Sequence, residues 1–293
     1  MDLRLKKSTF ARREARSGWL YAAVPLLGIT VFFVLPFLIS LLRTFQRGLT
    51  QEFVGLQNYI DILHSEAFLT AAGNTLRFMA FAVPLNVVLG LVIALGLHRL
   101  ASRAAFFRTV FLIPYVIPVS ATVMFFQILF EQSGVVNSAL QLIGKAPVEF
   151  LTSDRAFYVL LLLYLWKNFG YNMVIFLSGL ARIPRDYAEA ARIDGAGAFQ
   201  TFRHITMPLL APTFFFVFII SIMNSFKVFR EAYALGGEYP HESIYMLQHF
   251  MNNNLQNLNY QRVSVASLYV FVLIVLLVLA LYLWRRKKGD DRL

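Results

Sequence analysis

The chain has 293 residues, of which 58% are hydrophobic and 15% are charged, and it carries a net charge of +11. Soluble domains are about 45–50% apolar and about 25% charged. This composition, with a mean hydropathy of +0.61, therefore excludes an ordinary soluble globular protein. It also excludes a disordered chain, which needs low hydrophobicity. The lack of cysteine excludes a disulfide framework, a thiolate zinc site and a cysteine nucleophile.

Six runs of the sequence are long and apolar enough to cross a membrane, since about 20 residues span the hydrocarbon core. We therefore predict an all-α polytopic membrane protein with a basic N-tail (1–18), a transmembrane domain (19–284) and a basic C-tail (285–293). The predicted spans are Trp19–Leu42, Ala72–Leu97, Phe106–Phe130, Phe157–Leu180, Leu209–Phe226 and Val265–Trp284. The first run is longer than the apolar part of a signal peptide, so we expect it to be a span.

Positive charge gathers on one side of these spans. The two tails, with the second and fourth connections and their flanks, hold eighteen of the 27 Lys and Arg residues. Cytoplasmic loops carry such an excess, so we expect both termini in the cytoplasm, as an even number of spans requires. Membrane orientation thus accounts for the net charge, and no nucleic-acid partner is expected.

Several kinds of site are missing from the sequence. There is no G-x-x-x-x-G-K phosphate loop, so the chain is not expected to bind ATP by that route. The five His residues are scattered without ligand spacing, and no metal site is expected. Acidic residues are absent from the interiors of the predicted spans, whereas proton-coupled and sodium-coupled carriers usually need carboxylates there. This pattern disfavours a secondary transporter.

The fourth connection predicts a short exposed helix at about 184–197. Pro184 suits a first helical position, and the alanines that follow form helices with little bulk. Gly195 then acts as a stop signal. Such a helix is suited to a groove on another protein. The alternative is an interfacial helix that only joins two spans.

A more specific pattern runs through the same connection. It consists of Glu189-Ala190-Ala191, Gly195, Ile205 and Met207-Pro208. The spacing matches the E-A-A-x₃-G-x₉-I-x-L-P loop, and Met207 in place of Leu is the single departure. In this loop the sequence resembles the membrane subunits of binding-protein-dependent ABC importers.

Three further segments carry the resemblance over most of the chain. Phe53-Val54-Gly55-Leu56-Gln57-Asn58-Tyr59 is similar to the F-V-G-L-x-N-Y segment of sugar permeases, and Ile113–Pro118 and Phe176–Leu180 are also similar to segments of that group. Together they resemble the maltose-type sugar permeases, specifically the lactose or glycerol-phosphate "A/F" partner. The extra spans and the large outer loop of the maltose permease itself are missing.

The resemblance implies the transmembrane domain of a type I ABC importer in a bacterial or archaeal cytoplasmic membrane. The implied partners are a second homologous permease subunit in a heterodimer, two cytoplasmic ATPase subunits, an extracytoplasmic solute-binding protein, the sugar and the lipid bilayer. The chain itself is expected to hold no cofactor and no catalytic residue, because ATP and Mg would bind to the ATPase subunits. The short helix would be the coupling helix. The residues implied in coupling are Glu189, Ala190, Ala191, Asp194, Gly195, Ile205 and Pro208.

Polar side chains within the spans suggest a path for the substrate. Such groups are costly in a membrane and usually face a cavity or a neighbouring helix. In the fourth span they recur at helical spacing, which places them on one stripe. The candidates are Tyr115, Tyr164, Lys167, Asn168, Asn172, Ser221, Asn224 and Ser225. Aromatic faces, amides and hydroxyls are groups that a polyhydroxylated ring needs, and the positions approximate the cavity lining of maltose-type permeases.

Other roles remain open for some of these residues. Serines in spans also hold helices together, which is the alternative for Ser221 and Ser225. Lys167 has two alternatives, a pair with an acid of a partner chain or an extension to the membrane surface.

We therefore predict a membrane-spanning permease subunit and not an enzyme. It would move a sugar, as an oligosaccharide or glycoside, into the cytoplasm by alternating access. One alternative keeps the family but replaces the substrate by an anion, such as glycerol phosphate or an acidic saccharide, attracted by Lys167 and Lys227. A second alternative is an ATP-independent membrane carrier.

Overall fold

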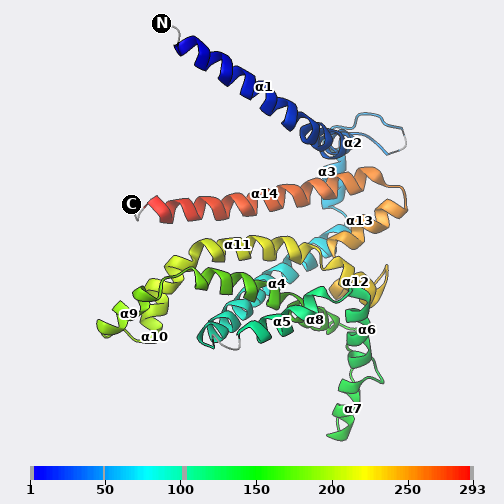
Figure 1. Cartoon of the computed structure of the whole chain (residues 1–293). Coiled ribbons are helices and arrows are strands. Elements are labelled where there is room, and N and C mark those ends of the chain that lie inside the picture. The colour runs from blue at the N-terminus through cyan, green and yellow to red at the C-terminus, as the bar shows by residue number, and fades with distance from the viewer. Residues whose placement is uncertain (1–2, 49, 101–103, 291–293) are drawn as a thin grey trace. The chain divides into compact units, whose positions relative to one another are not determined.

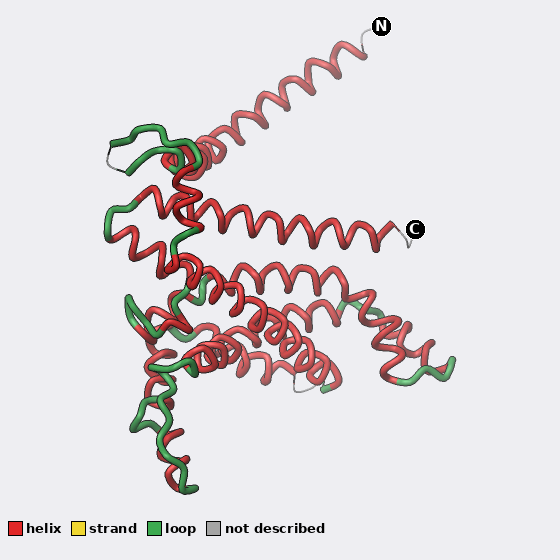
Figure 2. Tube along the Cα trace, turned by 180° about the vertical axis from the view of Figure 1, so that it is seen from behind, coloured by secondary structure: helices red, strands yellow, loops and turns green. Residues whose placement is uncertain are grey.

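The structure is a computed structural model that describes residues 3–48, 50–100 and 104–290. Within these ranges the chain is almost wholly helical, and the one β contact is an isolated antiparallel bridge between Gln46 and Phe53. Figure 2 shows helices joined by loops, the longer of which follow α2 and α7. The all-α fold class predicted from hydropathy is confirmed.

The helices differ widely in length (Figure 1). Their bounds are α1 Leu3–Ile29, α2 Leu35–Arg43, α3 Gln57–Leu63, α4 Glu66–Arg99, α5 Ala104–Val116, α6 Val119–Phe130, α7 Val135–Leu142, α8 Ala156–Ala181, α9 Arg185–Ile193, α10 Ala198–Thr201, α11 Met207–Phe226, α12 Phe229–Gly236, α13 Leu247–Gln256 and α14 Tyr260–Asp290. Two π-helical turns, Thr30–Val34 and Phe202–Thr206, connect α1 to α2 and α10 to α11 without a break.

Six helical stretches in the described residues are long and apolar enough to cross a membrane. They are Gly18–Arg43, Glu66–Arg99, Val119–Leu142, Ala156–Ala181, Ala198–Gly236 and Tyr260–Leu283. Five of them overlap almost the whole of a predicted span. The fifth stretch is longer than Leu209–Phe226 because it includes α10 and α12, whereas α11 itself, Met207–Phe226, agrees with the predicted span. The chain is therefore a multi-pass membrane protein.

The third predicted span, Phe106–Phe130, is wrong as a single helix. It is divided into α5 and α6 by a break at Ile117 and Pro118. Proline disfavours helical geometry in the residue before it and lacks the N–H that would continue the helix. Pro118 accordingly has an extended backbone, with ψ at 144°, and precedes the first residue of α6. Pro114 lies inside α5 and does not end it.

Two compact units make up the chain. The first comprises Met1–His64 with Asn254–Leu273, and the second comprises Ser65–Asn253 with Ile274–Leu293. In the first unit the Ser40 hydroxyl donates to the Ser264 hydroxyl at 3.0 Å. The rings of Phe37 and Phe271 lie 5.4 Å apart, so α2 and the beginning of α14 pack on each other.

The second unit is built around α4, α8 and α11, which lie side by side in Figure 1. Two apolar clusters hold them together. One lies around Phe78 and Phe157, and the other around Met173 and Phe176. Since these side chains come from different helices, burial of their apolar surface fixes the bundle in which both sites described below are formed.

Gly170 sets the closest approach between α5 and α8. A Cβ atom at this position would lie 1.8 Å from the carbonyl oxygen of Phe111. We predict that Gly170→Ala lowers the free energy of unfolding by about 1–3 kcal/mol, because the two helix backbones must separate. Thermal unfolding of the purified importer in detergent measures this. Gly73→Ala in α4 is the control, since a Cβ there meets nothing within 4 Å. Equal stability of both variants would contradict the prediction.

His249 in α13 is a buried histidine outside the membrane spans. Its side chain has no exposed surface, and its ring lies 4.8 Å from that of Phe229 and 5.5 Å from that of Tyr245. Its Nδ1 accepts the backbone N–H of Met246 at 3.0 Å. Burial among these groups disfavours the charged ring and lowers the pKa of His249 to about 4.

This pKa predicts a loss of stability in acid. The unfolded chain binds the proton with a pKa of about 6.5, so falling pH favours unfolding. The stability that the neutral His249 ring contributes is fully present above a pH of about 6.5 and is lost as the pH falls through about 4. The loss in the free energy of unfolding amounts to about 3 kcal/mol. In His249→Phe the acid-induced fall of the unfolding temperature should be smaller, whereas His64→Phe, at an exposed position, should behave as the unmodified protein. An unchanged pH profile in His249→Phe would refute this.

Candidate functional site

The predicted coupling helix is present as α9. The helix begins at Arg185, directly after Pro184, which is one residue later than predicted. It ends at Ile193, and Asp194 follows. Gly195 has a φ of +80°, a value that glycine adopts without strain, and this turns the chain away from the helix. The N–H of Ala196 returns to the Ala191 carbonyl at 2.8 Å and closes the turn.

Most of α9 faces solvent. Ala191 is its one buried residue, whereas Glu189, Ala190, Asp194 and Gly195 are exposed. Three large apolar side chains on α9 and the following segment are exposed as well: Tyr187 at 53%, Ile193 at 87% and Phe199 at 72%. We did not single them out from the sequence, although exposed apolar side chains of this size are typical of a protein-binding surface.

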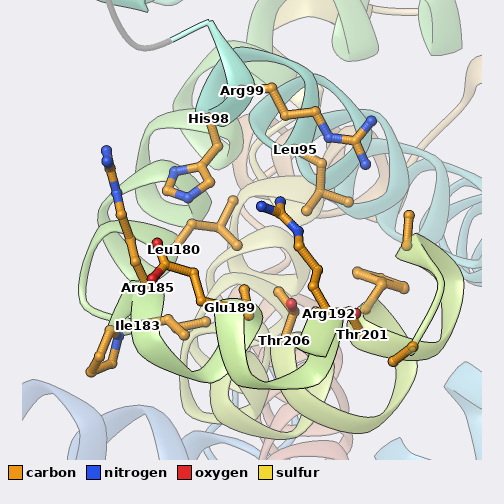
Figure 3. Close-up of a pocket in the computed structure, with 15 residues that line it drawn as sticks. Leu95, His98, Arg99, Leu180, Ile183, Arg185, Glu189, Arg192, Thr201 and Thr206 are labelled. Carbon is orange, nitrogen blue, oxygen red and sulfur yellow. The ribbon is translucent and has the colours of Figure 1, made fainter. Parts of the chain in front are cut away.

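A cavity of about 650 Å³ lies between α9 and the ends of α4 and α8. Figure 3 shows Glu189 and Arg192 extending from α9 toward His98 and Arg99 at the end of α4. Glu189 is the only residue of the predicted coupling set among those that line the cavity. One side of α9 thus borders the cavity, while three exposed residues do not line it: Ala190, Ile193 and Asp194.

The segment after α9 leads directly into a membrane span. Ile205 lies in the π-helical turn Phe202–Thr206, and Pro208 lies in the first turn of α11, where a missing N–H costs little. Both residues are partly buried. The stretch Ala198–Gly236 therefore comprises α10, the π-helical turn and α11 as a continuous helix up to Phe226, then a turn at Lys227 and Val228, and α12.

A second cavity, of about 340 Å³, lies among the membrane helices α5, α6, α8, α11 and α12. Five of the eight predicted path residues line it: Tyr115, Tyr164, Lys167, Asn168 and Asn224. We call it the polar cavity. The Tyr115 ring stacks on that of Tyr171 at 4.9 Å. The Asn168 amide group donates to the Tyr164 carbonyl at 2.8 Å.

The other three predicted path residues form hydrogen bonds among the helices and do not line the polar cavity. The Asn172 amide donates to the Ser221 hydroxyl at 2.9 Å, a bond between α8 and α11. The Ser225 hydroxyl donates to the Ile222 carbonyl at 2.7 Å within α11. All three residues are at most 2% exposed. Their geometry favours the packing role that was left open for the two serines.

Lys167 forms a buried ion pair with Glu231 of α12. Its Nζ lies 2.9 Å from Glu231 Oε1, and the two side chains are 9% and 7% exposed. Lys167 is thus paired with an acid of its own chain, a partner that neither alternative from the sequence included. Glu231 lies in α12, beyond the end of the predicted fifth span at Phe226, so a lysine of the fourth span pairs with an acid although the predicted span interiors hold none.

The family is decided by a comparison with known proteins. The profile described as "Binding-protein-dependent transport system inner membrane component" matches residues 86–288, more than half of the chain. The chain belongs to this family.

The inner membrane component has relatives of similar length. It is 31% identical to the trehalose/maltose transport system permease protein MalF of Thermococcus litoralis, over 90% of this chain and 91% of that protein. It is 32% identical to the lactose transport system permease protein LacF of Rhizobium radiobacter, over 78% of each chain. These relatives are transport subunits, and the inner membrane component is likewise not an enzyme.

Solved structures share the fold. A bacterial ABC transporter involved in the import of the acidic polysaccharide alginate superposes with a TM-score of 0.84, covers 95% of this chain and 99% of that chain, and is 22% identical. A structure of a bacterial alginate ABC transporter in complex with a pentasaccharide-bound periplasmic protein superposes with a TM-score of 0.79 at 22% identity. The architecture is thus that of an ABC importer transmembrane domain.

The Lys167–Glu231 pair of the inner membrane component is open to a direct stability test. Removing one partner leaves a buried charge alone, so we predict that Lys167→Met and Glu231→Gln each lower the free energy of unfolding by about 3–5 kcal/mol. The double variant should be more stable than either single variant, because no isolated charge remains.

Thermal unfolding of the purified importer in detergent measures all three variants. Lys145→Met, at an exposed position after α7, is the control and should leave stability unchanged. If the effects of the two single variants simply add in the double variant, the pair makes no coupled contribution and the prediction is wrong.

Proposed function

We propose that this inner membrane component is one of two membrane-spanning subunits of an ATP-driven importer. It would move a saccharide from an extracytoplasmic binding protein to the cytoplasm by alternating access. The relatives named for transport of trehalose or maltose and of lactose support a sugar as the cargo. The observation that carries the proposal is the helical stretch from α10 through α11, joined by one turn to α12, which begins beside the exposed α9 and lines the polar cavity where α11 meets α12.

The orientation follows from charge. The tails and the connections on the side of α9 carry eighteen of the 27 Lys and Arg residues, and such loops remain in the cytoplasm. Both termini would therefore be cytoplasmic, and α9 would stand on the side where ATP is available.

α9 would dock into a cleft of an ATPase subunit. Ala190, Asp194 and Gly195 present a narrow, exposed profile, and Ile193 supplies an apolar anchor at its end. ATP and Mg would bind to two such ATPase subunits and not to this chain. Closure of the ATPase dimer would displace α9, and the element that contains Ile205 and Pro208 would carry the displacement into the membrane.

The polar cavity would be this subunit's part of the saccharide path. Tyr115 offers an aromatic face, and Asn168 and Asn224 offer amide groups for ring hydroxyls. Asn224 and Glu231 belong to the element that follows α9, so a displacement of α9 would change the cavity wall. A second, homologous permease subunit would complete the path as a heterodimer.

Two substitutions on α9 test the coupling. Glu189→Lys and Ile193→Asp should each weaken attachment of the ATPase subunits about tenfold or more, because a charge is inverted or an apolar anchor is lost. Co-purification of the ATPase subunits in mild detergent and ATP hydrolysis stimulated by the loaded binding protein measure the effect.

Asp154→Lys is the matched control, since Asp154 is an exposed acid that precedes the opposite end of α8. It should leave ATPase attachment unchanged. If the chain is isolated without any ATPase subunit and Glu189→Lys leaves uptake intact, the importer proposal is wrong and an ATP-independent carrier is favoured.

A further inference from the structure

The polar cavity carries more positive than negative charge. Four charged side chains line it: Lys167, Lys227, Arg230 and Glu231. Lys167 and Glu231 neutralise each other at 2.9 Å. This pair leaves the positive charges of Lys227 and Arg230 in the same cavity.

Neither of these two cations has a carboxylate partner in the described part of the chain, where the ion pairs are Arg47–Glu52 and Lys167–Glu231. Lys227 Nζ lies 3.4 Å from the amide oxygen of Asn224, which is a neutral acceptor. Glu231 follows Lys227 by four residues, a spacing that permits a helical ion pair, but it is held by Lys167 instead. Both cations are exposed and so are accessible to a ligand.

The two cations lie where a membrane helix ends. Lys227 belongs to the turn after α11, and Arg230 belongs to the first turn of α12. Both line the polar cavity together with polar residues of the spans, and ionised side chains that face such a cavity often mark substrate pathways. An arginine recognises a carboxylate in particular, because its planar fork donates two parallel hydrogen bonds.

We propose that the polar cavity takes a saccharide that carries a carboxylate, such as a uronic acid unit. Arg230 and Lys227 would bind the carboxylate, and the Tyr115 ring and the amides of Asn168 and Asn224 would bind the ring and its hydroxyls. The Lys167–Glu231 pair would keep Glu231 from repelling the anion. This inference rests on the proposed function, since it requires the cavity to lie on the transport path.

The test uses the complete importer in proteoliposomes, with its own binding protein and ATP inside. Initial uptake rates are compared for labelled di- and trigalacturonate and for neutral maltose and maltotriose. We expect uptake of the galacturonates. The double variant Lys227→Gln/Arg230→Gln should lose about tenfold or more of that rate, as expected for the loss of charge-assisted hydrogen bonds. Arg230→Lys should retain part of it.

Two controls separate binding from folding. Lys145→Gln removes an exposed cation outside the cavity and should leave galacturonate uptake unchanged. The unfolding temperature of the double variant should equal that of the unmodified importer, since neither substituted side chain is buried.

Two outcomes would overturn the inference, and they differ from failure of the proposed function. Uptake of neutral saccharides without galacturonates would show that the cargo carries no charge. Equal uptake of both classes, unaffected by the double variant, would assign the two cations to an acid of the second permease subunit. Absence of uptake for every saccharide tested, with ATP hydrolysis intact, would contradict the saccharide path itself and the inference with it.

Discussion

A lysine inside a membrane helix needs a counter-charge, because an isolated ammonium group is costly away from water. In this chain the counter-charge is Glu231, and the pair with Lys167 ties α12 to α8 at the wall of the polar cavity. The pair also determines which other charges are available there, since Glu231 is withdrawn from Lys227 and Arg230. The position of α12 and the electrostatic character of the cavity therefore depend on one contact.

The same contact lies at the far end of the element that begins beside α9. From Ala198 to Phe226 the chain is helical, and a turn at Lys227 and Val228 joins this stretch to α12. Within the second unit α11 packs on α4 and α8. Close backbone approach at Gly170 fixes α5 against α8. A stiff element in a tightly packed bundle transmits a displacement instead of absorbing it, and under the proposed function this is how the exposed α9 would act on the polar cavity.

Sequence patterns located the spans well where the apolar run had no proline-induced break, as in Ala156–Ala181. They failed at Pro118, where an equally apolar run contains a break in the helix. The end predicted for the fifth span, Phe226, is the last residue of α11, and a turn at Lys227 and Val228 follows before α12. Hydropathy measures the composition of a run, whereas helix continuity depends on backbone hydrogen bonds.

The sequence by itself determined the membrane class, the helical architecture and the position of α9, because these depend on local properties: hydropathy, helix propensity and glycine at Gly195. Only the tertiary structure decided that Asn172 bonds to Ser221, while Asn168, on the same stripe of α8, faces the polar cavity. It alone paired Lys167 with Glu231, 64 residues away. Such choices depend on which helices pack together, and helical spacing within one span carries no information about its neighbours.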